Sequence, residues 1–335
     1  MNEHRIKKVI FFLLILIFVV SEVQGVEEII FPPPPEKSRI RFLQELRGPA
    51  DLKIKKSFLT KIWEFLVGEE PEEFGHPFAV AVRDEKIVVT DTKKRGFHIF
   101  DLGRNNYRIV VPRVVNLSSP VGAHIARDGR LFIVDSLLKK IFIFDIAGKF
   151  QGEFAHLFPF QRPTGIFSSP YDGSLWVVDT LAHQVISFNP AGEKLFILGK
   201  RGTKEGEFNY PTGITIGKDG RIYICDTLNA RIQMFSPVGK FISAFGKRGD
   251  STGDFSHPKA IALDSEGHLY VVDGLFDAIQ IFDEKGRLLL VFGQRGSRRG
   301  EFYVPTSLCI DESDRIFVVD SYNQRLQIFQ YLREY

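Results

Sequence analysis

Residues 208–235 read Phe-Asn-Tyr-Pro-Thr-Gly-Ile-Thr-Ile-Gly-Lys-Asp-Gly-Arg-Ile-Tyr-Ile-Cys-Asp-Thr-Leu-Asn-Ala-Arg-Ile-Gln-Met-Phe, and this pattern recurs six times between Phe74 and Gln330. The proline recurs at positions 77, 120, 163, 211, 258 and 305, and the second aspartate at 91, 135, 179, 226, 273 and 320. A Phe closes each unit, at 100, 144, 188, 235, 282 and 329, and another opens five units, at 74, 160, 208, 255 and 302. Eleven of the 32 Phe residues therefore belong to the repeat.

Each unit contains short β-rich runs separated by turn residues. In the fifth unit the runs are 260–263, 269–272, 279–282 and 288–292, and Gly-containing turns separate them. Successive repeated Asp residues are 44 or 47 residues apart. Four strands in a period of this length are typical of propeller blades. We therefore expect an all-β fold, a six-bladed β-propeller of four-stranded antiparallel blades, over residues 73–335.

The repeat resembles a known family. Residues 211–216, 222–235, 245–253 and 319–329 are similar to NHL repeats. The resemblance covers residues 74–330 and is strongest in units four to six. It is weaker in units one and two, where Gly-Phe-His-Ile-Phe100 replaces Arg-Ile-Gln-Met-Phe. It implies a six-bladed propeller of the kind that serves mostly as a binding platform, here in an exported bacterial form.

The N-terminus has the order of a secretory signal. Basic residues occur within Met1–Lys8, twelve apolar residues follow at Val9–Val20, and small residues precede a cleavage site after Gly25. Twelve residues are short for a membrane-spanning helix, which needs about 20. We therefore expect residues 1–25 to be a signal peptide, with an uncleaved membrane anchor as the alternative. Both interpretations place the rest of the chain outside the cytoplasm, in the periplasm, secreted, or anchored at the outer face of the inner membrane.

Residues 26–72 are expected to connect the signal to the ring and to close it. Pro32–Pro35 indicate a stiff spacer. The chain ends soon after the third strand of unit six, so an N-terminal strand is needed to complete that blade and protect its edge. We assign this role to residues 39–46, with 62–67 as the rival. Residues 57–67 fit a short helix better, because Ser57 is a suitable N-cap and Gly68 follows the helix.

The composition excludes several classes of site. Lys and Arg total 44 against 41 Asp and Glu, and a formal charge of +3 is too small to indicate nucleic acid. Cys225 and Cys309 are the only cysteines, which excludes a zinc finger, an iron–sulfur cluster, an attached haem and a disulfide framework. We expect both to be buried free thiols.

The six repeated Asp residues and a few histidines are the candidates for chemistry. Each Asp precedes a tight turn, so we expect its carboxylate to accept turn N–H groups and not to form an active site. His76, His124 and His257 are weak candidates for a metal in the central channel. Calcium would need inward Asp, Glu or Asn on several inner strands, and these strands offer almost none. We assign no cofactor and no catalytic residue.

The tips of the second-to-third-strand turns are unexpectedly apolar. The residue two positions after each repeated Asp is Lys93, Leu137, Leu181, Leu228, Leu275 or Tyr322, and Leu138 and Phe276 adjoin two of them. The links between blades reach the same end of the ring, and their basic residues include Lys200, Arg201, Lys247, Arg248, Arg295, Arg298 and Arg299. An apolar patch with a basic margin is typical of a protein interface. The alternative is that each Leu packs against its neighbouring link.

These observations favour an exported, monomeric, non-catalytic propeller that binds a protein partner with acidic character. One alternative is a metal-dependent propeller lyase or hydrolase with its site in the central channel. Another is a polyanion-binding propeller, as in RNA-regulating proteins with NHL repeats, although export argues against nucleic acid. Contact with a membrane is expected only through an uncleaved signal anchor.

Overall fold

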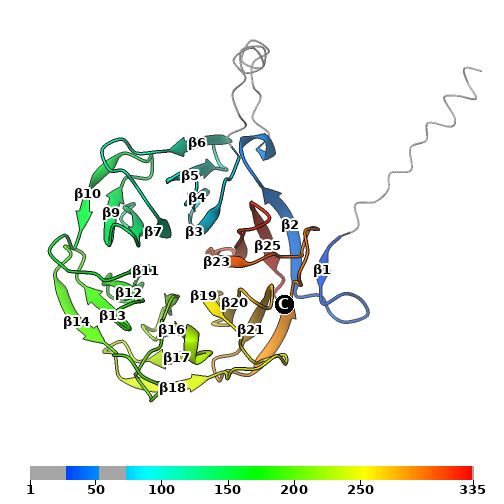
Figure 1. Cartoon of the computed structure of the whole chain (residues 1–335). Coiled ribbons are helices and arrows are strands. Elements are labelled where there is room, and N and C mark those ends of the chain that lie inside the picture. The colour runs from blue at the N-terminus through cyan, green and yellow to red at the C-terminus, as the bar shows by residue number, and fades with distance from the viewer. Residues whose placement is uncertain (1–27, 53–72, 334–335) are drawn as a thin grey trace, which may run out of the picture.

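Six antiparallel blades form a ring in the computed structural model, which describes residues 28–52 and 73–333 (Figure 1). The predicted six-bladed propeller is confirmed. The predicted signal at 1–25 and helix at 57–67 lie outside the described residues, as does the rival closing strand at 62–67. Within 28–52 and 73–333, no helix has the length and apolar character needed to cross a bilayer.

Each of the first three blades runs from an inner to an outer strand. The strands are β3 (Pro77–Arg83), β4 (Lys86–Asp91), β5 (Gly96–Asp101), β6 (Asn106–Val110), β7 (Pro120–Ile125), β8 (Leu131–Asp135), β9 (Lys140–Phe144), β10 (Phe150–Phe154), β11 (Pro163–Ser168), β12 (Leu175–Asp179), β13 (Gln184–Phe188) and β14 (Lys194–Leu198). Inner strands begin at the repeated proline, which has no N–H to donate to a sheet ladder. The repeated Asp ends the second strand of each blade.

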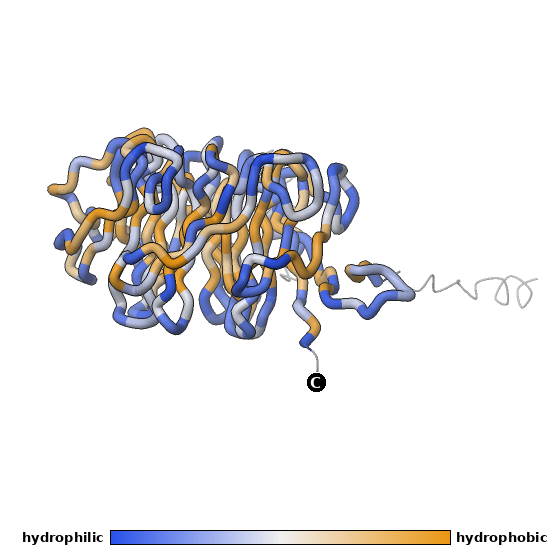
Figure 2. Tube along the Cα trace, turned by 90° about the horizontal axis from the view of Figure 1, so that it is seen from below, coloured by the Kyte–Doolittle hydropathy of each residue, from blue (hydrophilic) through white to orange (hydrophobic). Residues whose placement is uncertain are grey.

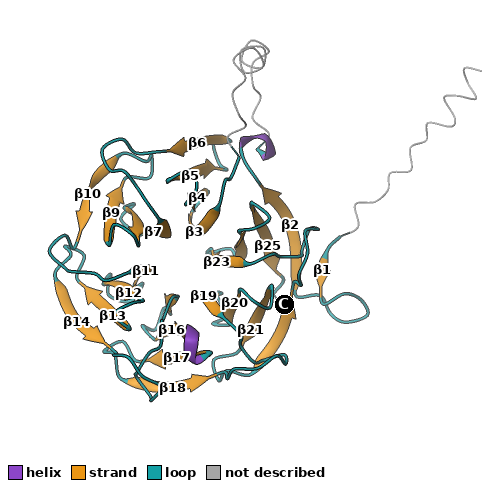
Figure 3. Cartoon of the chain, viewed as in Figure 1, coloured by secondary structure: helices purple, strands orange, loops and turns teal. Residues whose placement is uncertain are grey.

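The last three blades follow the same plan, except that the inner strand of blade four begins at Ile214, three residues after the repeated proline. Their strands are β15 (Ile214–Ile216), β16 (Ile222–Asp226), β17 (Arg231–Phe235), β18 (Phe241–Phe245), β19 (Pro258–Leu263), β20 (Leu269–Asp273), β21 (Ala278–Phe282), β22 (Leu288–Phe292), β23 (Pro305–Ile310), β24 (Arg315–Asp320) and β25 (Arg325–Tyr331). In blade five the observed strands match the predicted runs to within two residues. Figure 3 shows how little helix accompanies them: only short 3-10 turns, at Pro49–Asp51 and Thr227–Asn229, occur among the described residues.

The sixth blade takes its outer strand from the other end of the chain. Strand β2 (Ile40–Leu46) pairs antiparallel with β25, so that Ile40 faces Tyr331 and Leu46 faces Leu326. Ile40 and Leu46 are fully buried. A further strand, β1 (Ile30–Phe31), pairs with β2 and makes this sheet five-stranded, which the sequence analysis did not predict.

The apolar core is divided among the six interfaces between neighbouring blades. Each interface holds one cluster of buried side chains, and the cluster between blades six and one also contains Leu46 and Leu52. Apolar segments run through the middle of the ring, whereas many turns at its edges are hydrophilic (Figure 2). The stability of the ring therefore depends on blade-to-blade packing.

The repeated Phe residues account for part of this core. In five blades the opening and closing Phe rings contact each other, with centroids 5.5–5.9 Å apart, and all ten are buried. Blade two has no opening Phe, and its closing ring, Phe144, packs on Phe97 of blade one at 5.0 Å. Tilted and edge-to-face pairs of this kind add to the gain from burial.

The contacts of the repeated Asp residues differ in part from those predicted. All six are buried, and each accepts at least one backbone N–H group from the segment just before the repeated proline. Among the described residues, N–H groups of the following turn reach only Asp91, Asp135 and Asp273. Asp135 also accepts from the N–H groups of Leu137 and Leu138, at 3.1 and 3.0 Å, in the following turn. Each carboxylate thus joins the start of its blade to the second strand.

Candidate functional site

The apolar turn tips face solvent at one end of the ring. We call this end the turn face. Leu137 is 70% exposed, Leu275 63% and Tyr322 57%, whereas Leu181, Leu228 and Leu138 are less exposed and Phe276 is half-buried. Lys93 takes the equivalent place in blade one and is exposed. Leu137 and Leu275 are therefore not packed away over the neighbouring links.

Basic residues from the links lie beside these tips. The guanidinium of Arg248 donates a hydrogen bond to the carbonyl oxygen of Leu228 over 3.0 Å. Arg201, Arg295, Arg298 and Arg299 are exposed as well, and Nε of Arg299 lies 4.0 Å from the carboxylate of Glu45. The contact between Arg248 and Leu228 places links and turn tips at the same end of the ring.

An aromatic group that the sequence analysis missed continues the turn face across blades six and one. The ring of Tyr322 lies 5.1 Å from that of Tyr303 and 5.9 Å from that of His76. The guanidinium of Arg295 stacks on Tyr303 at 5.0 Å. Tyr303 follows the opening Phe of its unit, where the other units carry Gly, Gln, Asn or Ser. A large aromatic residue in a position that is otherwise small or polar is the sequence signal that could have identified Tyr303.

The three histidines considered for a metal do not form one site. His76 contacts Oγ1 of Thr92 through Nδ1 at 3.0 Å and does not line the channel. His124 and His257 do line it, but no group of three or more His, Cys, Asp or Glu residues in 28–52 and 73–333 is placed to hold a metal ion.

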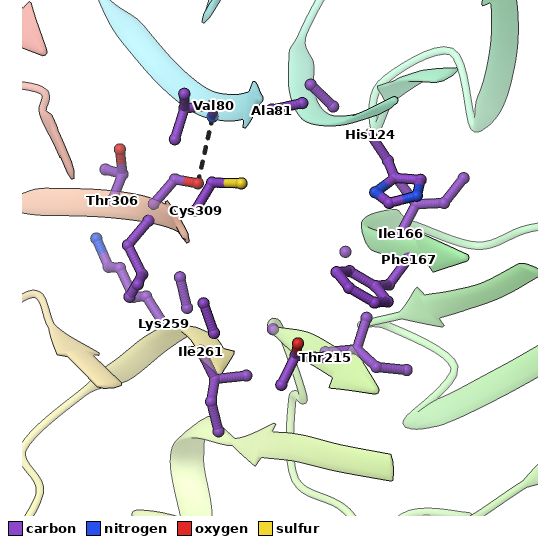
Figure 4. Close-up of a pocket in the computed structure, with 18 of the residues that line it drawn as sticks. Val80, Ala81, His124, Ile166, Phe167, Thr215, Lys259, Ile261, Thr306 and Cys309 are labelled. Carbon is purple, nitrogen blue, oxygen red and sulfur yellow. Dashed lines mark hydrogen bonds between the residues drawn. The ribbon is translucent and has the colours of Figure 1, made fainter. Parts of the chain in front are cut away.

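The inner strands enclose a cavity of about 740 Å³ on the axis of the ring (Figure 4). Leu228 and His257 line it near the turn face, and Arg83 and Glu312 line it near the opposite end. A second cavity of about 710 Å³ begins there and shares Arg83 and Glu312 with the first. The two volumes together form a channel through the ring.

The prediction that both thiols are buried is wrong for Cys309. Cys225 is buried, as expected, but Cys309 is only half-buried and lines the channel, with its sulfur pointing inward in Figure 4. Burial raises the pKa of Cys309 to about 11, so the thiol is protonated at neutral pH and is a weak nucleophile.

Hydroxyl groups join the blades around the opening at the turn face. Thr180, Thr227 and Ser321 each follow a repeated Asp and donate to the carbonyl oxygen of the next blade's repeated proline, at 2.7, 2.8 and 2.6 Å. Blade five has Gly274 in this position. A Cβ atom there would lie 2.9 Å from Cε of Lys259, so the glycine makes room for the lysine chain.

Two segments of the chain match the family model of the NHL repeat, residues 208–235 and 302–329. The chain carries NHL repeats. A comparison with curated proteins finds no match. The matched segments belong to blades four and six, and the contacts of the repeated Asp show why.

In these two blades, Oδ2 of the repeated Asp accepts hydrogen bonds from the same three kinds of side chain. Asp226 accepts from Asn229, Arg231 and Gln233 at 2.8, 2.8 and 3.0 Å. Asp320 accepts from Asn323, Arg325 and Gln327 at 2.9, 2.7 and 3.2 Å. Blade two has Leu138, Lys140 and Phe142 in the three places of these donors, and its Asp135 uses backbone donors.

Solved structures similar to this propeller include enzymes and binding proteins. Virginiamycin B lyase from Staphylococcus aureus is 15% identical, with a TM-score of 0.59, and the match covers 86% of this chain and 99% of that one. A gluconolactonase from Xanthomonas campestris is 16% identical (TM-score 0.59; 77% and 87% covered). An auxiliary nutrient binding protein from Bacteroides thetaiotaomicron is 15% identical (TM-score 0.58; 78% and 70% covered). At these identities the likeness concerns the fold alone.

Proposed function

We propose that this NHL propeller is a non-catalytic binding protein that holds a protein partner on its turn face. The observation that carries the proposal is the exposure of Leu137, Leu275 and Tyr322 at equivalent turn tips. Turn tips are ordinarily polar, and an apolar patch with a polar rim marks an interaction surface.

The arc over blades four to six is the best-supported part of this surface. It contains Leu228, Leu275 and Tyr322, with Arg248 and Arg295 between them in the chain. Tyr and Arg are the side chains that most often dominate binding energy at protein interfaces. Tyr322 is held in place by its contact with Tyr303, and Arg295 is stacked on the same ring, so binding would order few additional side chains.

The charges of the links indicate the character of the partner. Lys200, Lys247, Arg295 and Arg299 are all well exposed, and their nearest carboxylates lie 3.5–4.0 Å away. Exposed pairs at such distances are weak, which leaves the basic side chains available to a partner. An acidic protein would be steered to this face and would bind less well at high salt.

Export is part of the same proposal. The basic and apolar pattern at residues 1–25 supports secretion, so the partner would be met outside the cytoplasm.

Photo-crosslinking in the producing cells tests the function. A photoreactive amino acid replaces Leu275 on the turn face or, as a control, Val238, which is 80% exposed in the turn between the third and fourth strands of blade four. We expect position 275 and not 238 to yield a defined adduct, from which mass spectrometry identifies the partner.

The purified partner then permits a quantitative test. The double variant L275D/Y322A should bind it at least about tenfold more weakly, because two exposed anchors are lost, while V238D should bind as the wild type does. Equal crosslinking at both positions, or undiminished binding by the double variant, would show that the turn face is not the docking surface.

A further inference from the structure

One level of the central channel is strongly asymmetric. The fourth residue after each repeated proline lines the larger cavity, and around the ring these residues are Ala81, His124, Phe167, Thr215, Ala262 and Cys309. The large or polar members come from the adjacent blades two, three and four. The residues from blades one, five and six, which are Ala81, Ala262 and Cys309, are small, and Figure 4 shows Ala81 and Cys309 across the cavity from Phe167 and Thr215.

Two polar groups where the two cavities meet, Thr215 at this level and Arg83 two residues beyond Ala81 on β3, have no partner within the described residues. Thr215 is 2% exposed, and Figure 4 shows its hydroxyl directed into the cavity, yet it makes no hydrogen bond in 28–52 and 73–333. Arg83, the last residue of β3, is half-buried and lines both cavities, and no described carboxylate lies within ion-pair distance of it. A half-buried guanidinium without a partner is costly unless an anion or water satisfies it.

His124 supplies a third donor. Its Nε2 accepts the backbone N–H of Ser168 at 3.1 Å and lies 2.6 Å from Oγ of the same residue. Acceptance at Nε2 places the proton of the neutral ring on Nδ1. Burial and the charge of Arg83 lower the pKa of His124 to about 4, so the ring is neutral at pH 7 and its Nδ1–H remains a donor.

The apolar surroundings and the nearby carboxylates restrict which ligand could bind to Arg83, His124 and Thr215. Phe167 and Leu263 line both cavities beside the donors and provide an apolar wall. Arg315 pairs with Asp311 and Glu85, at 2.6 and 3.3 Å. The exposed Asp84 and Glu312 remain at the mouth, where they would repel a ligand with more than one negative charge.

We propose that the channel binds a small organic monocarboxylate, with its carboxylate hydrogen-bonded to Arg83, His124 and Thr215 and its apolar body beside Phe167. The cavity of about 740 Å³ is within the range of small-molecule sites, roughly 300–1,000 Å³. The site lies inside the ring and shares none of these four residues with the turn face, so it is independent of the proposed protein docking.

The first test uses two acids and a neutral control as probes. Ligand-observed NMR measures binding of 3-phenylpropionate and octanoate to the full chain, with 3-phenylpropanamide as the uncharged counterpart. We expect the acids to bind with a Kd of about 1 mM or tighter and the amide about tenfold more weakly. Failure of both acids to bind, or equal binding of acid and amide, would overturn the proposal.

Alkylation of Cys309 reports where the acid binds. At pH 9, each bound acid should slow the reaction of Cys309 with iodoacetamide, because this thiol lines the same cavity. Cys225 is fully buried away from the cavity and serves as the internal control. Binding by NMR without protection of Cys309 would place the acid elsewhere and refute the site.

Variants then test the donors. R83M and the near-isosteric T215V should each weaken binding of 3-phenylpropionate, R83M by about tenfold because a charge-assisted contact is lost. The control is R127M, because Arg127 lines only the second cavity and donates to the carbonyl of Pro170 at 3.0 Å. Thermal unfolding verifies that each variant is folded. Unchanged affinity in both R83M and T215V would disprove the assignment of these donors.

Discussion

Arg325 donates a hydrogen bond from Nε to Oδ2 of Asp320 over 2.7 Å, and both side chains are buried. The same guanidinium donates from Nη1 to Glu45 on β2 at 2.9 Å. From Nη2 it donates to the carbonyl oxygens of Arg298 and Glu301, at 2.7 and 2.8 Å. One side chain thus connects β24, the closing strand and the link that precedes blade six.

Replacing Arg325 with Met should lower the free energy of unfolding by about 3–5 kcal/mol, because Asp320 would lose its buried partner. Urea unfolding followed by circular dichroism measures the change. The matched control is R287M, which removes an ion pair with Asp283 in which the Arg side chain is 75% exposed, and it should cost less than about 1 kcal/mol. Similar losses in the two variants would mean that the buried cluster contributes no more than a surface pair.

Removal of residues 39–46 should destabilise the ring by several kcal/mol. The deletion exposes the edge of β25 and takes away the fully buried side chains of Ile40 and Leu46, each of which contributes about 1.5–3 kcal/mol. Thermal unfolding of the deletion variant is compared with that of the intact chain. A variant that melts at the same temperature would show that β2 does not hold the ring closed.

The stability should fall between about pH 6.5 and pH 4, in part because of His124. The pKa of this group is lowered from 6.5 to about 4 in the folded chain, so in this window the unfolded chain binds a proton that the folded chain does not. At about 1.4 kcal/mol per pKa unit, the contribution is at most about 3 kcal/mol.

Urea unfolding at pH 7.5 and 4.5 tests this dependence. The variant H124Q should lose less stability on acidification than the wild type, whereas H156Q, at an exposed position, should lose as much as the wild type does. If H124Q and the wild type respond identically to acid, His124 does not govern this part of the pH profile.

The exported protein should lack residues 1–25. Intact-mass measurement of the protein recovered from outside the cytoplasm should give a chain that begins at Val26. Recovery of chains that retain Met1 in the membrane fraction would instead support the uncleaved anchor.

Much of the architecture could be predicted because the same residues recur at the same places in all six units. The proline that starts an inner strand, the buried Asp after the second strand and the closing Phe recur at fixed positions, and each acts mainly within its own blade. Six copies therefore reveal the blades although no single copy is distinctive. The contacts of Asp226 were predictable only in part, because its carboxylate was expected to accept N–H groups of the following turn, whereas it accepts hydrogen bonds from the N–H of Asn209 and the side chain of Asn229.

The tertiary structure was needed for contacts that do not recur from one repeat unit to the next. The pairing of β1 with β2 and the contact of Tyr303 with Tyr322 depend on how separate segments pack, which the repeat does not encode. The half-buried position of Cys309 was likewise not predictable from its strand alone.

The sequence by itself determined the number of blades, the places of their strands and the apolar turn tips, because these follow from periodicity and local turn chemistry. Only the tertiary structure decided what the channel contains. His124, Phe167 and Thr215 occupy equivalent positions in three repeats, but their shared surroundings arise when the ring closes and brings the small residues of blades one, five and six opposite them. A channel is formed by six blades together, so its chemistry depends on the differences among the repeats and not on what they share.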